Sequence, residues 1–352
     1  MLSRDWRDSR RAGMLKGYSS VVIHNWTALD TWSAAMLDPK GLYELVGDVP
    51  ELDAPVLVYS LEGFMDAGSA GKGLVDNLLS TLQHRTVARF DADILVDYRA
   101  RRPELLFVED HFERYAAPEL ALRLVHDTHR TPFLLLTGPE PDVQWERFAA
   151  AVIGLIEQLR VRLTIGVHGI PMAVPHTRPL GVTAHATRRE LVTVVNPWRG
   201  EIRLPSSMSS LLELRLGEAG HDAMGFVAHV PHYLAEADYP DASLVLLRSI
   251  AAATGLALPA DALAEAAGVT RKLVQEQVDQ SEEVGRVVRA LETQFDAFVG
   301  GTGELPGECV YVRHDQSNGI PAEAGERLVV DVGGPPHEPQ EGVGPARGLE
   351  NH

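Results

Sequence analysis

LVYSLEGFMDAGSAGKGLVDNLL, the stretch Leu57–Leu79, decides the fold class of this chain. It opens in an apolar run, Val56–Tyr59, that is typical of a buried strand, and the run stops at Glu62 and Gly63. A loop of small residues then leads into a helix with an apolar face at Leu74, Val75, Leu78 and Leu79. Strand, turn and helix in this order predict the opening unit of a βα fold, with the loop at the carboxyl end of the strand, where open α/β sheets bind ligands.

The same alternation continues along the chain. A second buried strand is expected at Phe133–Thr137, a third at Leu163–His168 and a fourth at Leu191–Val195, with further strand segments in 88–98 and 105–108, the last two forming an antiparallel pair. Asp142 is the expected N-cap of a helix whose apolar face is Trp145, Phe148, Val152, Leu155, Ile156 and Leu159. The pattern predicts an α/β fold, a mostly parallel sheet with helices on both faces.

Beyond Pro240 the strand pattern gives way to helices. We expect a helix over Ser243–Thr254, another starting at Asp261 as its cap, and a long one over Thr270–Phe298. The apolar seam of this long helix can pack on its own chain or form an intermolecular coiled coil. We prefer packing on the same chain, because the seam is short for a coiled coil. We therefore divide the chain into a flexible leader, an α/β core, a C-terminal helical segment packing on the core and a largely disordered acidic Gly/Pro tail, at 1–20, 21–255, 256–299 and 300–352.

Composition excludes several classes of protein. A net charge of −17 and a pI near 5.2 argue against nucleic-acid binding. The sole cysteine cannot form an internal disulfide, and no apolar run reaches the roughly 20 residues of a membrane span, so we expect a cytoplasmic protein. Arg10 and Arg11 resemble part of a twin-arginine signal, but the apolar segment is missing; a basic leader, or a true start at Met14, explains the region better.

Candidate site residues follow the predicted strands. The loop onto the first helix can hold an anion at free backbone N–H groups, although Asp66 or Ser69 capping that helix is the simpler interpretation. The spacing of a phosphate-binding Walker loop is absent at Gly71–Gly73. The candidate ligand-binding residues are Glu62, Gly63, Asp66, Gly68, Ser69, Thr137 and Glu140.

No catalytic signature or recognised metal-ligand spacing is present, so no metal and no cofactor is expected. His168 and His176 bracket a Pro-rich turn but lack a third ligand at a recognised spacing. If the chain is an enzyme, His168 is the candidate acid or base and Arg178 the candidate anion clamp.

Four segments together resemble the proteasome assembly chaperone 2 family, in particular its long actinobacterial branch. The resemblance runs from about Val56 to Thr254 and extends over the helical segment to Phe298. The segments are LEGFMDAGSAGKG (Leu61–Gly73), TGPEPDVQWERF (Thr137–Phe148), GIPMAVPHTRP (Gly169–Pro179) and GFVAHVPHYLAEADYPDASLVLLRSI (Gly225–Ile250).

The resemblance implies a core similar to that of purine nucleoside phosphorylases and related hydrolases. It also implies a homo-oligomer, for example a trimer, and proteasome core subunits as partners. Archaeal relatives engage the proteasome through a terminal hydrophobic–tyrosine–any-residue tail. This chain ends in Gly348–His352 instead, and its Val310–Val312 (VYV) is internal, which puts tail insertion in doubt.

Two functional hypotheses therefore stand. One is a non-catalytic interaction or assembly-chaperone-like protein, which we prefer. The other is a small-molecule binder or nucleoside phosphorylase/hydrolase-like enzyme that uses the crevice at the strand ends.

Overall fold

The protein is described by a computed structural model covering residues 37–48, 51–192 and 203–299. The leader at 1–20 and the tail at 300–352 lie outside these residues. The strands are β1 (Tyr43–Leu45), β2 (Val56–Glu62), β3 (His84–Phe90), β4 (Leu105–Val108), β5 (His111–Tyr115), β6 (Leu120–His126), β7 (Pro132–Pro139), β8 (Leu163–Met172), β9 (Val182–Ala186) and β10 (Ala223–Pro231).

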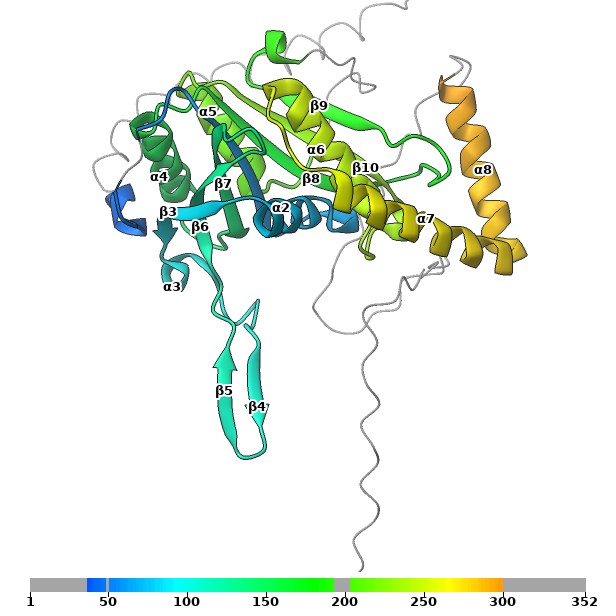
Figure 1. The fold of residues 1–352 in the computed structure, drawn as a ribbon, viewed down its shortest axis with the longest axis horizontal. Coiled ribbons are helices and arrows are strands. Elements are labelled where there is room, and N and C mark those ends of the chain that lie inside the picture. The colour runs from blue at the N-terminus through cyan, green and yellow to red at the C-terminus, as the bar shows by residue number, and fades with distance from the viewer. Residues whose placement is uncertain (1–36, 49–50, 193–202, 300–352) are drawn as a thin grey trace, which may run out of the picture.

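Helices connect and cover these strands (Figure 1). The α-helices are α2 (Ala70–Thr81), α3 (Ala92–Leu95), α4 (Trp145–Gln158), α5 (Met208–Glu218), α6 (Pro240–Thr254), α7 (Asp261–Gln280) and α8 (Glu282–Val299). Short 3-10 helices are η2 (Pro39–Leu42), η3 (Ala67–Ser69), η4 (Arg189–Leu191) and η5 (His232–Leu234). None of the described helices is long and apolar enough to cross a membrane.

Eight strands form one sheet in the order β1-β3-β6-β7-β2-β8-β10-β9. The four central strands, β7, β2, β8 and β10, are parallel, while β1, β3 and β6 flank them antiparallel on one side and β9 does so on the other. The expected α/β fold is confirmed, and the antiparallel flanks make the sheet mixed.

Side-chain alternation along β2 shows why both faces of the sheet are covered. Val56 and Val58 point into a core shared with α2, α6 and α7, whereas Leu57, Tyr59 and Leu61 point into a second core shared with α4 and α5. The run Val56–Tyr59 is apolar at every position, so both faces of the strand must be buried, because successive side chains point to opposite sides.

The expected strand at Leu191–Val195 is wrong in its described part. Leu191 ends η4 and Val192 is not in a strand, while 193–195 lie outside the described residues. The sheet is completed instead by β9 and β10, and β10 is buried along its whole length. The sequence analysis did not predict β10, although its run AMGFVAHVP is as apolar as that of β8, which also contains a glycine and a histidine.

Three helix predictions also need correction. The segment predicted as one helix over Thr270–Phe298 is two helices, α7 and α8, which break at Ser281. Helix α7 begins at Asp261 itself, with Ala260 at the cap position. Asp142 does not cap α4, since its carboxylate accepts hydrogen bonds from the Asp97 N–H (2.7 Å) and from Arg101 (2.7 Å).

A second, two-stranded sheet stands apart from the first. Strands β4 and β5 form an antiparallel hairpin that projects away from the body of the protein (Figure 1). The antiparallel pair expected between 88–98 and 105–108 is therefore wrong in its partner: β4 pairs with β5, and the earlier segment contributes the end of β3 and helix α3.

Candidate functional site

The parallel strands bring the predicted loop residues to one edge of the sheet. Glu62, the last residue of β2, lies opposite Pro139 of β7, and Pro171 of β8 lies opposite Val230 of β10. The loops that follow these strands therefore leave from the same edge, as the rule for parallel sheets requires. The contacts made there by each candidate side chain decide what this edge can do.

Glu140 is the centre of the first group at this edge. Its buried carboxylate accepts hydrogen bonds from the backbone N–H groups of Phe64 (3.0 Å) and Met208. Its own N–H donates to the carbonyl of Glu62 (2.8 Å). A Cβ on Gly63 would collide with the Glu140 carboxylate, so glycine is needed where the loop passes it. Glu62, Gly63 and Glu140 thus join the ends of β2 and β7 to the start of α5.

Arg101 adds a charged contact to this group. Its guanidinium donates to the carbonyls of Glu62 (3.0 Å) and Glu140 and to the Asp142 carboxylate (2.7 Å). Sequence reasoning missed Arg101, because the loop before β4 gave no sign that it returns to the strand ends. Thr137 lies deeper in β7, where its hydroxyl accepts a hydrogen bond from Arg123 (2.5 Å).

Asp66 forms a second group. Its carboxylate accepts hydrogen bonds from the backbone N–H groups of Gly71 (2.8 Å), Lys72 (3.0 Å) and Gly169 (3.0 Å). Burial raises the pKa of Asp66, and these hydrogen bonds act in the opposite direction. The carboxylate therefore caps the start of α2 and ties it to β8, which is the capping role considered from the sequence.

The small residues between Asp66 and α2 shape this turn. Gly68 has φ +67° and packs against Tyr239 and Val230. Ser69 also has a positive φ, 49°, and its side chain makes no capping hydrogen bond. Ligand binding by Gly68 and Ser69 stays a prediction.

His168 and Arg178, the candidate catalytic pair, have different surroundings. Burial, with a smaller effect of His185, lowers the pKa of His168 to about 4, so its imidazole is neutral at pH 7. Arg178 lies in the loop after β8 and pairs with Asp296 (2.7 Å) and Glu292 (3.1 Å) of α8. Among the described residues, no hydrogen bond or ion pair joins His168 to Arg178.

His176 is buried beside Tyr233. The Tyr233 hydroxyl lies 2.7 Å from His176 Nδ1 and accepts a hydrogen bond from the His176 N–H (2.9 Å). Burial lowers the pKa of His176. The described part of the chain contains no group of three or more His, Cys, Asp or Glu residues placed to hold a metal ion.

The larger cavity was not foreseen from the sequence. A cleft of about 390 Å³ lies between the loop after β8 and the junction of α7 and α8. It exists because the chain breaks at Ser281, and the run Ser281–Glu283 is a helix-start signal that could have located it. The cleft is lined by Thr177, Gln275, Val278, Asp279, Ser281, Glu282, Gly285, Val288, Arg289 and Glu292.

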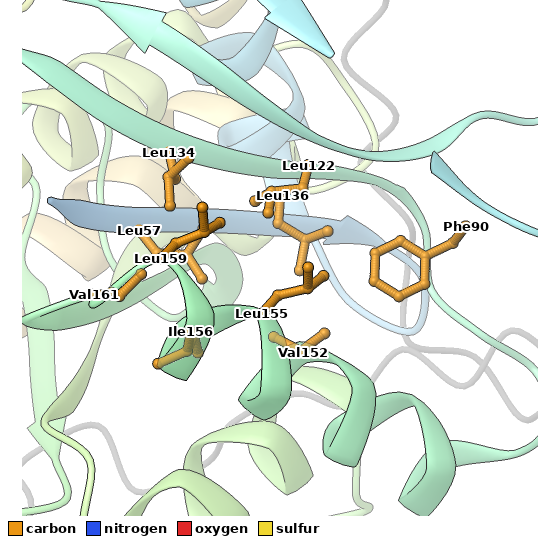
Figure 2. A pocket seen from close by; sticks show the side chains of 10 residues that line it. All are labelled: Leu57, Phe90, Leu122, Leu134, Leu136, Val152, Leu155, Ile156, Leu159 and Val161. Atoms are coloured by element: carbon orange, nitrogen blue, oxygen red, sulfur yellow. The ribbon is translucent and has the colours of Figure 1, made fainter. Parts of the chain in front are cut away.

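Figure 2 shows a second, much smaller cavity between the sheet and α4. Its volume is about 10 Å³ and every side chain around it is apolar. A space of this size is too small for a ligand, and its apolar lining offers no hydrogen-bond partner to a water molecule. It is a packing gap in the core.

Comparisons with known proteins place this geometry in context. The sequence model of the PAC2 family matches residues 60–278. A Mycobacterium tuberculosis protein of unknown function is 48% identical, with 74% of this chain and 90% of that one covered and a TM-score of 0.72. A Corynebacterium glutamicum protein of unknown function is 38% identical, with 73% and 98% covered and a TM-score of 0.71.

A more distant structure carries a functional description. A proteasome-assembly chaperone homologue from Mycobacterium tuberculosis is 23% identical, with 66% of this chain and 99% of that one covered and a TM-score of 0.61. At this identity the similarity shows a shared fold. A search of curated proteins finds no significant match.

Proposed function

The chain belongs to the PAC2 family, and from this premise we propose that it is a non-catalytic interaction protein of the assembly-chaperone type, acting in the cytoplasm. A protein with the same fold is described as a proteasome-assembly chaperone homologue, which makes proteasome core subunits the first partners to test. This transfer to the present chain is part of the proposal.

The observation that carries the proposal is that polar groups at the strand ends have hydrogen-bond or ion-pair partners within the chain. The carboxylates of Asp66 and Glu140 bind backbone N–H groups of their own chain, and the Arg178 guanidinium binds carboxylates of α8. A catalytic acid, base or anion clamp needs an atom that is free to meet a substrate. Here these groups hold elements of the fold together.

The outer surface of α8 is the candidate partner surface. Arg286 and Arg289 are both exposed on this helix, and Arg289 also lines the cleft, whereas Val288 and Leu291 are buried against the chain. Exposed Glu282 and Glu283 lie one turn before Arg286, so this surface carries both signs and its arginines can pair with carboxylates of a partner. We expect partner binding to depend on both arginines.

The experiment is affinity purification from the native host, with partners identified by mass spectrometry. The wild-type chain should retain proteasome core subunits, and the double variant Arg286→Glu/Arg289→Glu should lose them. Arg189→Glu, which reverses an exposed arginine in η4, serves as the matched control and should retain them. Equal retention by all three chains would remove α8 from the proposal, and no retained subunit would contradict the proteasome-related role.

The cleft at the α7–α8 junction favours one alternative, a small-molecule-binding protein or nucleoside phosphorylase/hydrolase-like enzyme. Its volume of about 390 Å³ falls in the range of small-molecule sites, roughly 300–1,000 Å³. Native mass spectrometry of the purified protein would detect a bound metabolite. Phosphate-dependent cleavage of purine nucleosides would support the enzyme. His168 does not line the cleft, so His168→Gln tests its catalytic role at the strand ends separately, and unchanged activity would exclude that role.

A further inference from the structure

The cleft at the α7–α8 junction is lined by charged side chains of both signs. Figure 1 shows α8 leaving the end of α7 at a steep angle. Asp279, near the end of α7, and Glu282, the first residue of α8, line the cleft. Arg289 lines it as well, about two turns further along α8. A ligand that enters this cleft therefore meets carboxylates on one side of the helix break and a guanidinium beyond it.

Glu282 and Arg289 are not neutralised by the chain itself. Within the described residues, neither of them takes part in an ion pair. The Arg289 side chain folds back toward the start of α8, since its Nη1 lies 3.1 Å from the position that a Cβ on Gly285 would occupy. Long helical side chains lean in this direction. The guanidinium thus lies about one turn nearer to Glu282 than the Arg289 backbone does.

The other two carboxylates of the cleft differ in how far the chain uses them. Glu292 pairs with Arg178 (3.1 Å), so its charge is balanced. Asp279 accepts a hydrogen bond from the Gln275 side-chain amide (2.8 Å) through Oδ1, and Oδ2 is outside that bond. An ammonium group has three hydrogens to donate. Asp279 and Glu282 together offer it acceptors on both sides of the break.

A buried imidazole behind the cleft has one nitrogen without a hydrogen bond. His176 is 7% exposed, its Nδ1 lies 2.7 Å from the Tyr233 hydroxyl, and its Nε2 has no hydrogen-bond partner among the described atoms. Burial lowers the pKa of His176, while Gln275 and Glu292, which both line the cleft, act in the opposite direction and so lie near this ring. Because Tyr233 occupies Nδ1, Nε2 is the nitrogen that faces the cleft wall. Buried polar atoms nearly always have a partner, so this one points to a polar ligand group beside it.

We propose that the cleft binds a free α-amino acid with an aliphatic side chain. The ammonium group of the ligand binds Asp279 and Glu282, and its carboxylate binds Arg289. Its side chain packs on Val278 and Val288, the apolar residues of the lining. Charges of both signs are needed, because the guanidinium repels a simple cation and the carboxylates repel a simple anion.

The spacing of the charges favours one amino acid over a longer peptide. The guanidinium lies near the level of Gly285, which is about 4.5 Å from Glu282 along the helix axis. In an amino acid the ammonium and the carboxylate share one carbon, so with a hydrogen bond at each end they span roughly 8 Å between protein atoms. Each further peptide residue adds about 3.5 Å. Side chains that start about one turn apart match the shorter span.

This inference rests on the small-molecule alternative proposed above and names the class of ligand. It requires neither the proteasome-related role nor a catalytic role of His168. The cleft volume of about 390 Å³, near the lower end of the range for small-molecule sites, agrees with a small ligand.

Isothermal titration calorimetry of the full-length protein tests the ligand class. L-Leucine should bind at one site per chain. We expect 4-methylpentanoate, which lacks the ammonium group, and 3-methylbutylamine, which lacks the carboxylate, to bind at least about tenfold more weakly, because each loses charge-assisted hydrogen bonds. Equal binding of either analogue and L-leucine would overturn the inference, and so would tighter binding of L-leucyl-L-leucine.

Substitutions locate the site. Arg289→Ala should weaken L-leucine binding at least about tenfold without weakening that of 3-methylbutylamine, and Glu282→Gln should do the same without weakening that of 4-methylpentanoate. Lys272→Ala and Glu276→Gln change exposed charges of α7 outside the cleft and should bind L-leucine as the wild type does. L-Leucine binding that is unchanged in both cleft variants would overturn the inference.

Native mass spectrometry of the purified protein separates this inference from the small-molecule alternative on which it rests. A retained amino acid that is lost in Arg289→Ala would support both. A different retained metabolite that is lost in the same variant would overturn the amino-acid class and support the alternative. No retained metabolite, together with no calorimetric signal from L-leucine, would overturn both.

Discussion

Arg178 and Asp296 form a two-bond ion pair between the loop after β8 and helix α8. Arg178 Nε lies 2.8 Å from Asp296 Oδ1, and Nη2 lies 2.7 Å from Oδ2. The pairing raises the pKa of Arg178 and lowers that of Asp296. Sequence reasoning expected Arg178 to clamp a carboxylate or phosphate of a ligand. In the structure the carboxylate that it holds belongs to the last described helix of its own chain.

Removing this pair should loosen α8 without unfolding the core. In Arg178→Ala we expect several-fold faster amide exchange in 282–298 and unchanged exchange in β2 and β8, because Asp296 and Glu292 of the helix both lose their ion pair with Arg178. Hydrogen exchange with mass spectrometry measures both regions in one experiment. Arg188→Ala, which breaks an exposed pair with Asp222, is the control and should leave α8 unchanged. The same exchange rate in Arg178→Ala and wild type would show that α8 is held by other contacts.

Glu140 should matter for stability. Glu140→Gln replaces one acceptor oxygen by an NH₂ group that faces a backbone N–H of Phe64 or Met208. We expect the free energy of unfolding to fall by about 1–3 kcal/mol, the usual cost of leaving a buried polar group unsatisfied. Urea denaturation measures the change. Glu157→Gln alters an exposed side chain and should shift the value by less than about 0.5 kcal/mol; a similar small shift in Glu140→Gln would contradict the structural role.

The sequence predicted the central strands well because their local signals are strong. β2, β7 and β8 each contain a short apolar run that ends near a glycine or proline, although Gly166 and His168 lie within β8, and α2 and α4 show a clear helical period. β10 was not predicted from the sequence, although its run AMGFVAHVP contains a glycine and a histidine just as that of β8 does. The break between α7 and α8 was missed because the apolar seam continues across Ser281, whereas the capping signal at Ser281 is short.

For the candidate site, the sequence predicted where the residues lie but not what they contact. The rule for parallel strands correctly placed Glu62, Asp66 and Glu140 at one edge of the sheet. It gave no information on their partners, since those come from distant segments: the Met208 N–H is 68 positions from Glu140, and Asp296 is 118 positions from Arg178. Whether an acidic side chain meets solvent or a backbone N–H depends on such contacts, which no local pattern encodes.

Gly68 offers a test of the turn before α2. Its φ of +67° is unfavourable for a residue with a Cβ, and an added Cβ would lie 3.0 Å from Tyr239 Cβ and 3.1 Å from Val230 Cγ1. In Gly68→Ala we expect a loss of about 2–3 kcal/mol, of which the left-handed backbone accounts for about 1–2. Gly220 has φ +81°, and an added Cβ there would meet no atom within 4 Å. Gly220→Ala should therefore show only the part of the stability loss that comes from the left-handed backbone. Equal losses in thermal or urea unfolding would mean that Tyr239 and Val230 move aside freely.

His168 and His229, whose imidazoles are shielded from water, should make stability fall in mild acid. Burial lowers the pKa of both His168 and His229 to about 4, against about 6.5 in the unfolded chain. Below about pH 6.5 the unfolded state takes up these protons first, so stability is complete above that pH, declines between 6.5 and 4, and is constant below. At pH 5 each histidine accounts for a loss of about 1–2 kcal/mol.

Denaturation of His168→Gln and His229→Gln at pH 7 and pH 5 isolates this effect, because glutamine does not titrate. Each variant should lose about 1–2 kcal/mol less than the wild type between the two pH values. Asp66, whose pKa is raised by burial, opposes the decline, but it is common to all three chains and cancels in the comparison. His84→Gln, at an exposed position, should follow the wild type. If all four chains lose the same free energy, the two imidazoles titrate alike in the folded and unfolded states, and burial does not hold them neutral.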